Sequence, residues 1–197
     1  MLRKARRLIR NVVFDLRFGG FIGGSKKTPF AHLGAKDTIN SDYGALPWVL
    51  GPVLEHGDVF VDVGCGRGRV LNWVLAQHKA AKLYGIEIDP EVAREVRTRL
   101  ARYPNVEILV GDALQNIPGD ATLFYLYNPF ARHVMEQYRD ALIESYGRSG
   151  GLERVRLVYY NCVDVDVYER DPRCVVRRLD LPPEFHPSAV VTFTNPR

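Results

Sequence analysis

Apolar residues recur along this chain with two different periods, which separate strands from helices. Short, nearly continuous apolar runs, typical of buried strands, occupy residues 58–64, 82–88, 105–112, 121–129 and 153–162. Apolar positions at helical spacing occupy residues 68–78, 90–103 and 132–147. Because these strands and helices alternate, the pattern predicts βαβ units that build a parallel sheet.

The two ends of the chain depart from this alternation. Residues 173–181 and 188–194 read as strands joined by the proline-rich "PPEFHP" without a helix, so we expect an antiparallel pair that closes the sheet. Residues 2–17 read as an amphipathic helix, and glycines break the pattern after it. The predicted fold class is therefore α/β, a doubly wound, mostly parallel seven-stranded sheet with an antiparallel C-terminal hairpin and an N-terminal helical extension.

The chain divides into an arm, residues 1–40, and a domain, residues 41–197. Hydrophobic residues make up 46% of the 197 residues, which is enough for a sizeable core, and no apolar run reaches the roughly 18 residues of a membrane span. The three cysteines, Cys65, Cys162 and Cys174, form no CxxC pair. We therefore expect reduced thiols, no metal site and a cytoplasmic protein.

Positive charge is concentrated in the arm. The net charge is +4 overall, but residues 1–27 carry +7, so the remaining 170 residues carry −3. The apolar stripe of the arm helix consists of Leu8, Ile9, Val12, Val13 and Leu16. Three interpretations are open: the stripe packs on the domain, the arm recruits nucleic acid or an acidic protein, or the helix attaches the protein peripherally to an anionic membrane surface.

A glycine-rich turn follows the first strand of the domain, in the stretch "VFVDVGCGRGRV". Gly64, Gly66 and Gly68 form G-x-G-x-G, and Arg69 occupies the position of the third glycine in a dinucleotide-binding turn. No Gly-Lys-Ser/Thr follows, so the turn is not a phosphate-binding P-loop either. Asp62, just before the turn, repels pyrophosphate and suits a cationic ligand.

Carboxylates end three successive strands, at the sheet edge where a doubly wound fold binds its ligands. Asp62 can accept a hydrogen bond from an ammonium group. Glu87, 23 residues after Gly64, stands where a carboxylate binds two ribose hydroxyls. Asp112 can accept from the exocyclic amine of adenine, or it can cap a helix that starts there. Ammonium, ribose and adenine are the parts of S-adenosylmethionine.

The stretches "FVDVGCGRGRV", "YGIEID" and "LVGDA" resemble, in order and spacing, the first three motifs of class I S-adenosylmethionine-dependent methyltransferases. The resemblance covers roughly residues 40–197, including the closing hairpin. It implies a sheet with helices on both faces, S-adenosyl-L-methionine as cofactor and S-adenosyl-L-homocysteine as product. The residues that it assigns to the cofactor are Asp62, Gly64, Cys65, Gly66, Gly68, Glu87, Ile88, Asp112, Ala113 and Asn128.

The fourth strand ends in a corner, Asn128-Pro129-Phe130, that is similar to two known elements. One is the Asn-Pro-Pro-aromatic motif of amino methyltransferases, of which it lacks one proline, and the other is the Asn-Asn-Phe element of non-SET histone-lysine methyltransferases. The Asn side-chain oxygen and the Pro carbonyl can accept two N–H bonds from a target nitrogen, and the ring can stack on it. This predicts that the three residues are catalytic and that the acceptor is an amine or amide. The alternative is an ordinary turn, with Asn128 as a helix cap and Phe130 in the core.

Further candidates lie around the same crevice. Tyr43 and Trp48 belong to the segment before the first domain strand, which in this family lies over the cofactor, so they are either substrate contacts or part of a packed helix start. Asn161 ends the fifth strand and is a third candidate substrate contact. The histidines are scattered, and His133 is the one near the corner.

The sequence therefore predicts an enzyme that methylates a nitrogen of a protein, peptide or small molecule by in-line displacement. Three alternatives are open: an RNA methyltransferase, an O-methyltransferase of a small molecule, and a non-catalytic subunit that binds S-adenosylmethionine. A dinucleotide-dependent oxidoreductase is disfavoured by Asp62 and Arg69.

Overall fold

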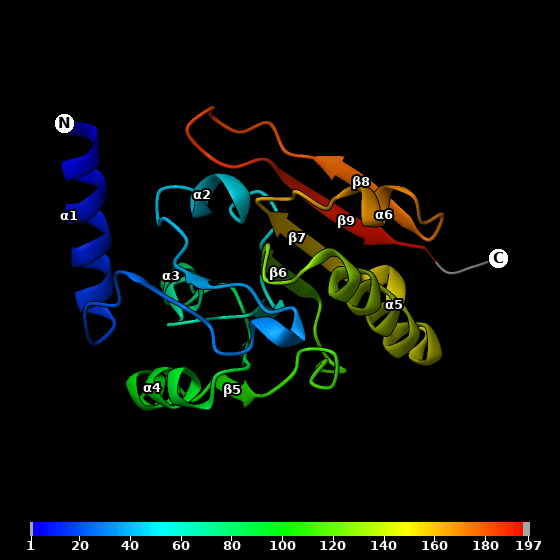
Figure 1. Ribbon diagram of the computed structural model, residues 1–197, viewed down its shortest axis with the longest axis horizontal. Coiled ribbons are helices and arrows are strands. Elements are labelled where there is room, and N and C mark those ends of the chain that lie inside the picture. Colours follow the sequence, from blue (N-terminus) through cyan, green and yellow to red (C-terminus); the bar gives the residue numbers. More distant parts are fainter. Residues whose placement is uncertain (1, 195–197) are drawn as a thin grey trace.

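A seven-stranded sheet runs through the computed structural model, which describes residues 2–194 (Figure 1). Its strands are β3 (Val59–Val63), β4 (Lys82–Glu87), β5 (Val106–Val110), β6 (Leu123–Tyr127), β7 (Arg156–Tyr160), β8 (Cys174–Arg178) and β9 (Ser188–Phe193). The order across the sheet is β5-β4-β3-β6-β7-β9-β8. Neighbours from β5 to β7 are parallel, and β9 is antiparallel to β7 and β8. The predicted fold class is confirmed.

Helices cover both faces of this sheet. They are α1 (Leu2–Arg17), α2 (Leu46–Val49), α3 (Arg69–Gln77), α4 (Pro90–Leu100), α5 (Arg132–Ser149) and α6 (Asp166–Glu169). Short 3-10 helices occur at Ala31–Leu33 and Leu152–Arg154, and a separate two-stranded ladder pairs β1 (Ser25–Lys26) with β2 (Thr38–Ile39). No helix among residues 2–194 combines the length and the apolar character needed to cross a membrane.

The sheet separates two hydrophobic clusters because successive strand residues face opposite sides. Phe60 belongs to the cluster that includes residues of α2, α3 and α4. Its neighbour Val61 belongs to the cluster that includes residues of α5 and α6. Both side chains are fully buried, as expected for a parallel sheet covered on both faces.

The connection from β4 to α4 forms where its sequence signals predict. The Asp89 Oδ1 atom accepts hydrogen bonds from the backbone N–H groups of Glu91, at 2.9 Å, and Val92, at 3.4 Å. Pro90 occupies the first helical position, where no N–H partner is needed. The strand therefore passes into the helix within three residues, which fixes Glu87 at the carboxyl edge of the sheet.

A buried ion pair attaches α1 to the rest of the fold. Asp15 is fully buried, and its Oδ2 atom lies 2.7 Å from the Arg69 Nη2 atom. The second carboxylate oxygen, Oδ1, accepts from the Tyr43 hydroxyl at 2.8 Å and from the Arg69 Nε–H at 3.2 Å. Asp15, the only acid among residues 1–27, is thus buried in an ion pair with Arg69, the first residue of α3.

This anchor turns a different face of α1 toward the body than the apolar stripe predicts. Asn11 and Asp15 are buried, as is Phe18 directly after the helix, and the Phe14 ring lies at a tilt against Tyr43 with 4.2 Å between ring centroids. The residues left exposed are Leu8, Ile9, Val13 and Leu16. The interpretation in which the stripe packs on the domain is therefore wrong, because the buried ion pair sets the rotation of the helix.

Candidate functional site

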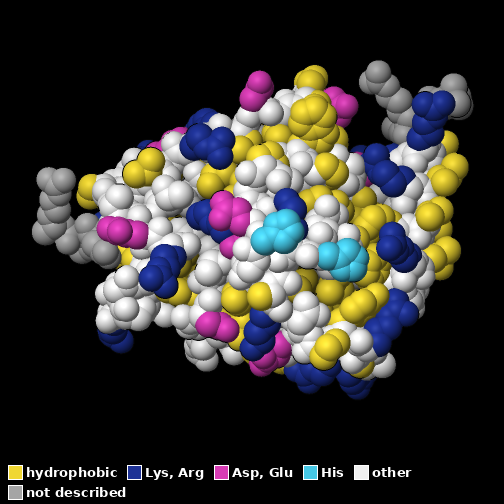
Figure 2. Space-filling view, turned by 180° about the vertical axis from the view of Figure 1, so that it is seen from behind, with side chains coloured by type: hydrophobic (Ala, Val, Ile, Leu, Met, Phe, Trp, Pro, Cys, Tyr) yellow, Lys and Arg dark blue, Asp and Glu magenta, His cyan; other side chains and the backbone are white. Residues whose placement is uncertain are grey.

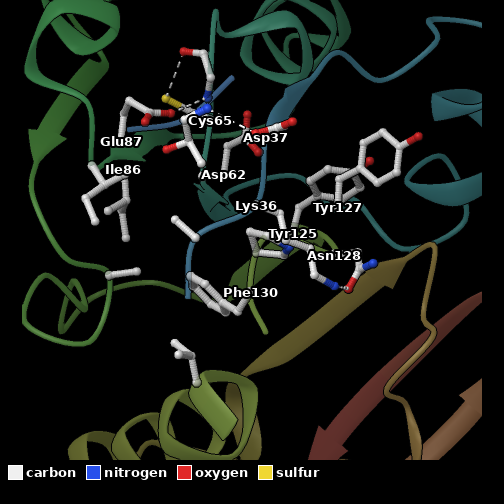
Figure 3. A pocket seen from close by; sticks show the side chains of 18 of the residues that line it. Lys36, Asp37, Asp62, Cys65, Ile86, Glu87, Tyr125, Tyr127, Asn128 and Phe130 are labelled. Atoms are coloured by element: carbon white, nitrogen blue, oxygen red, sulfur yellow. Dashed lines mark hydrogen bonds between the residues drawn. The ribbon is translucent and has the colours of Figure 1, made fainter. Parts of the chain in front are cut away.

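A cavity of about 710 Å³ opens at the carboxyl ends of the parallel strands (Figure 3). It lies where β3 has β4 on one side and β6 on the other, which is the point where the strand order reverses. Figure 3 shows Asp62 and Glu87 at one side of this cavity and Lys36 and Asn128 at another. Segments far apart in the chain therefore build one site.

The turn after β3 adopts a conformation that favours glycine. Gly64, Gly66 and Gly68 have φ angles of +70°, +51° and +76°, values that side chains with a Cβ atom disfavour. A Cβ atom on Gly64 would lie 3.1 Å from the Cβ atom of Pro129, so the turn and the corner after β6 approach each other closely. Gly64 and Gly66 line the cavity. Gly68 does not line it and is the residue directly before α3.

Glu87 holds this turn from the neighbouring strand. Its Oε2 atom accepts a hydrogen bond from the Gly66 N–H at 2.8 Å, and its Oε1 atom accepts from the Asp89 N–H at 3.0 Å. Burial raises the pKa of the Glu87 carboxyl, which these two backbone donors partly offset. Glu87 also lines the cavity, so one side chain positions the glycine turn and faces the ligand space.

Asp62 carries an unpaired oxygen in a buried place. The residue is only 3% exposed, and its Oδ2 atom has no hydrogen-bond partner within the described part of the chain. Burial, reinforced by the charge of Glu87, raises the pKa of Asp62 to about 8. A buried acceptor without a donor is unfavourable, and a cationic ligand in the cavity removes that cost. Asp62 lines the cavity and is therefore placed to receive an ammonium group.

The remaining predicted cofactor residues also line this cavity. Asp112 does so at the end of β5, and its Oδ1 atom accepts from the Leu114 N–H at 3.0 Å. That contact closes a turn, and no helix starts there among the described residues, so the alternative role of Asp112 as a helix cap is wrong. Ile88 and Ala113 line the cavity as well. The Cys65 thiol is buried, which raises its pKa well above the ordinary value and keeps it protonated.

The corner after β6 is arranged differently from the prediction. The Asn128 Oδ1 atom accepts from the Lys36 Nζ atom at 2.7 Å and from the Tyr159 hydroxyl at 3.0 Å. The Pro129 carbonyl accepts from the Lys36 backbone N–H at 2.9 Å. Both oxygens that the sequence offered to a target amine therefore already have donors. Phe130 lines the cavity and also contacts Tyr138 in the core, with 5.4 Å between ring centroids.

The alternative in which Asn128 caps α5 is wrong. The helix begins at Arg132 after Ala131, and no side chain caps it. Asn128 instead adopts a φ of +45°, a value rare outside glycine, which aims its side chain at Lys36 and Tyr159. Backbone strain of this kind concentrates at functional sites.

A segment of the arm completes the site. An isolated bridge pairs Ala35 with Phe130, and Thr28, His32, Lys36 and Asp37 line the cavity. No local sequence pattern identifies these residues as part of a site. The signal lies in pairing with residues more than 90 positions away, as in the Lys36–Asn128 hydrogen bond.

Two predicted substrate contacts lie elsewhere. The Tyr43 hydroxyl binds Asp15 and accepts from the Asn72 side chain at 3.0 Å, so it is taken up by the anchor of α1. Trp48 is on α2, half exposed to solvent, and neither residue lines the cavity. The geometry does not support their assignment as substrate contacts. Asn161 and His133 both line the cavity.

Residues 60–148 match the family model described as "Methyltransferase domain". These residues carry a methyltransferase domain. Its cofactor is S-adenosyl-L-methionine, and the residues of the cavity fit that molecule. The unpaired Asp62 oxygen suits the ammonium group, the glycine turn leaves room beside the backbone, and Glu87 and Asp112 face the same space. No group of three or more His, Cys, Asp or Glu side chains is arranged to hold a metal ion in the described part of the chain.

Solved structures share the fold of this methyltransferase. An RNA methyltransferase from Salinibacter ruber, in complex with S-adenosyl-L-homocysteine, is 23% identical with a TM-score of 0.59 over 80% of this chain and 94% of that one. The B. subtilis tRNA methyltransferase TrmK is 15% identical with a TM-score of 0.60 over 80% and 68% of the two chains. A methyltransferase from Pyrococcus furiosus is 13% identical with a TM-score of 0.61 over 100% of both. No curated protein sequence matches the chain significantly.

Cofactor binding to the methyltransferase is expected to strengthen as pH rises. The raised pKa of Asp62, about 8, means that the free carboxyl is protonated at lower pH, whereas the ligand ammonium is held by the ionised form. The affinity for S-adenosylhomocysteine should therefore increase about tenfold per pH unit from about pH 6 and level off near pH 8. Calorimetric titration across this range measures the slope. Asp62→Asn should flatten it, and an equally steep slope in that variant would contradict the assignment.

Proposed function

We propose that the methyltransferase methylates an oxygen nucleophile, a hydroxyl carried by a small molecule or displayed by a larger one. The observation that supports this choice is the double use of Lys36, whose side chain donates to Asn128 and whose backbone N–H donates to Pro129. With its oxygen occupied twice, Asn128 offers its amide N–H groups to the acceptor. Such a corner suits an acceptor atom that itself accepts hydrogen bonds.

Charge around the acceptor part of the cavity favours the same choice. Lys36 and Arg7 line it, together with three histidines, His32, His133 and His186. Two acids act on these cations: the negative charge of Asp164 acts on Lys36, and Asp42 pairs with Arg7 at 3.0 Å. Neither acid lines the cavity, so a protonated amine entering here would meet the lysine and the arginine first, whereas a hydroxyl would not be repelled.

Lys36 is the candidate general base. Burial lowers the pKa of its ammonium group from the ordinary value, while the negative charge of Asp164 acts in the opposite direction. A lowered pKa makes the neutral form of a lysine easier to reach, and that form can take a proton from a hydroxyl. The Asn128 Oδ1 atom accepts hydrogen bonds from both the Lys36 Nζ atom and the Tyr159 hydroxyl, which holds the lysine side chain in place. S-adenosylmethionine, when bound, supplies an electrophilic methyl group on its sulfonium.

The proposal is tested by offering the purified protein tritiated S-adenosylmethionine with separate pools of acceptors. The pools contain phenols and alcohols, carboxylates, amine-bearing peptides, and RNA. Label in the hydroxyl or carboxylate pools, located on oxygen by mass spectrometry, is the expected result. Label confined to nitrogen atoms of the peptides or of RNA bases would overturn the proposal in favour of the nitrogen or RNA alternatives. Cofactor binding without product in any pool would favour a non-catalytic subunit.

Lys36→Met is expected to lower kcat/KM about a hundredfold and to leave the affinity for S-adenosylhomocysteine nearly unchanged. In the unaltered enzyme, kcat/KM should rise with pH as Lys36 loses its proton, and this rise should disappear in the variant. The pH profile on the best acceptor is the measurement. Lys79→Met is the matched control. The Lys79 Nζ atom donates a hydrogen bond to the Leu54 carbonyl at 3.1 Å, but Lys79 does not line the cavity. A retained pH-dependent rise in Lys36→Met would exclude the general-base role.

A further inference from the structure

Helix α1 has two chemically different faces. The face toward the body holds buried Asn11 and Asp15, and Phe18 continues it directly after the helix. The opposite face holds what we call the α1 stripe, Leu8, Ile9, Val13 and Leu16, whose exposed fractions are 59%, 62%, 63% and 58%. In Figure 2 these hydrophobic side chains follow the outer edge of the molecule at the right, with Lys and Arg side chains next to them.

The α1 stripe is large and continuous for the surface of a monomer. Its members recur at helical spacing, so they form one ridge along the helix. Phe21, just after the helix, is also exposed, at 57%. Scattered exposed apolar residues are ordinary, but a contiguous patch rimmed by polar groups marks an interaction site.

The charge beside the α1 stripe is uniformly positive. Arg6, Arg10 and Arg17 are exposed on the same helix. Asp15 is fully buried against Arg69, so no acidic side chain of residues 5–17 reaches the surface of α1. Asp42, on the neighbouring segment, pairs with Arg7 at 3.0 Å and with Arg10 at 2.9 Å, and both guanidinium groups stay about half exposed or more. Arg6 and Arg17 have no acidic partner in the described part of the chain, so the surface combines an apolar ridge with an excess of positive charge.

From this combination we infer that α1 docks the methyltransferase on an anionic lipid surface. A helix of this kind lies in the plane of the interface, with apolar side chains among the acyl chains and arginines at the anionic headgroups. A nucleic acid would engage the arginines but leave the α1 stripe in water. A second copy of α1 would cover the stripe but bring two rows of arginines together. Anionic lipid satisfies both features at once.

The test is co-sedimentation of the full chain with vesicles. Binding is expected to vesicles of phosphatidylcholine and phosphatidylglycerol, and it should weaken in high salt and with phosphatidylcholine alone. The double variant Ile9→Gln/Val13→Gln should lower the vesicle partition coefficient by about tenfold or more. Its matched control is Val163→Gln/Val175→Gln, because Val163 and Val175 are similarly exposed, at 63% and 55%, but lie outside α1.

Three results would overturn the inference. The first is equal vesicle binding by the two double variants. The second is no binding to anionic vesicles together with a dimer, seen by analytical ultracentrifugation, that Ile9→Gln/Val13→Gln dissociates. The third is salt-sensitive binding to RNA that the stripe variant retains while vesicles are not bound. Unchanged S-adenosylhomocysteine affinity and circular dichroism in each variant show that the chain is folded, so a loss of vesicle binding reports on the surface.

Discussion

Gly66→Val is expected to abolish measurable binding of S-adenosylhomocysteine, with a loss of at least about a hundredfold in affinity, while the protein stays folded. The reason is twofold. Gly66 has a φ of +51°, which a β-branched residue disfavours, and its N–H is fixed by Glu87 at 2.8 Å. Its backbone also lines the cavity, so a side chain there projects into ligand space. Isothermal titration with the variant measures the loss.

The control for this substitution isolates the backbone strain. Gly150 ends α5 in the same left-handed region, with a φ of +69°, and a Cβ atom added there would meet nothing within 4 Å. Gly150→Val therefore carries a comparable conformational cost but should bind S-adenosylhomocysteine normally. Normal binding by Gly66→Val, or a loss of equal size in both variants, would show that the glycine turn does not hold the cofactor.

Asp15→Asn is expected to lower the free energy of unfolding by about 3–5 kcal/mol, because it leaves the Arg69 guanidinium buried without its counterion. Arg69 is only 7% exposed, and its contacts with Asp15 at 2.7 and 3.2 Å are lost or weakened together. Urea unfolding followed by fluorescence measures the change, since Trp73 is buried on α3, one helical turn after Arg69.

The comparison is an ion pair at the surface. Glu144 and Arg148 are 64% and 76% exposed on α5, and Glu144→Gln should change the free energy of unfolding by less than about 1 kcal/mol. If Asp15→Asn cost no more than this, the Asp15–Arg69 pair would not be what holds α1 to the body. Limited proteolysis gives a second reading, because loss of the anchor should speed cleavage at the arginines of α1.

The parts of the structure that the sequence predicts are those set by local signals. Strand and helix periods, the Asp89-Pro90 start of α4 and the helix-free tail are each encoded within a few residues. The cofactor side of the cavity follows from the same logic. Asp62, Glu87 and Asp112 end successive strands, and the parallel sheet brings those ends to one edge.

The acceptor side could not be predicted because it depends on contacts between distant segments. Lys36 and Asn128 are 92 residues apart, and no local pattern reveals that the lysine occupies the asparagine oxygen. The prediction that Tyr43 contacts the substrate is not supported for a related reason, since its hydroxyl donates to Asp15, 28 residues earlier. The rotation of α1 was likewise mispredicted, because one buried carboxylate outweighs a row of apolar side chains in deciding which face packs.

The Asp15–Arg69 ion pair also limits when α1 can dock during synthesis. The ribosome delivers Asp15 54 residues before Arg69. At synthesis rates of about 5–20 residues per second, the aspartate waits about 3–10 s for its partner. An isolated helix of this length is marginal in water, so the segment has no stable place on the body during that interval. Docking of α1 is thus expected only after the residues of the glycine turn, which precede Arg69, have been synthesised.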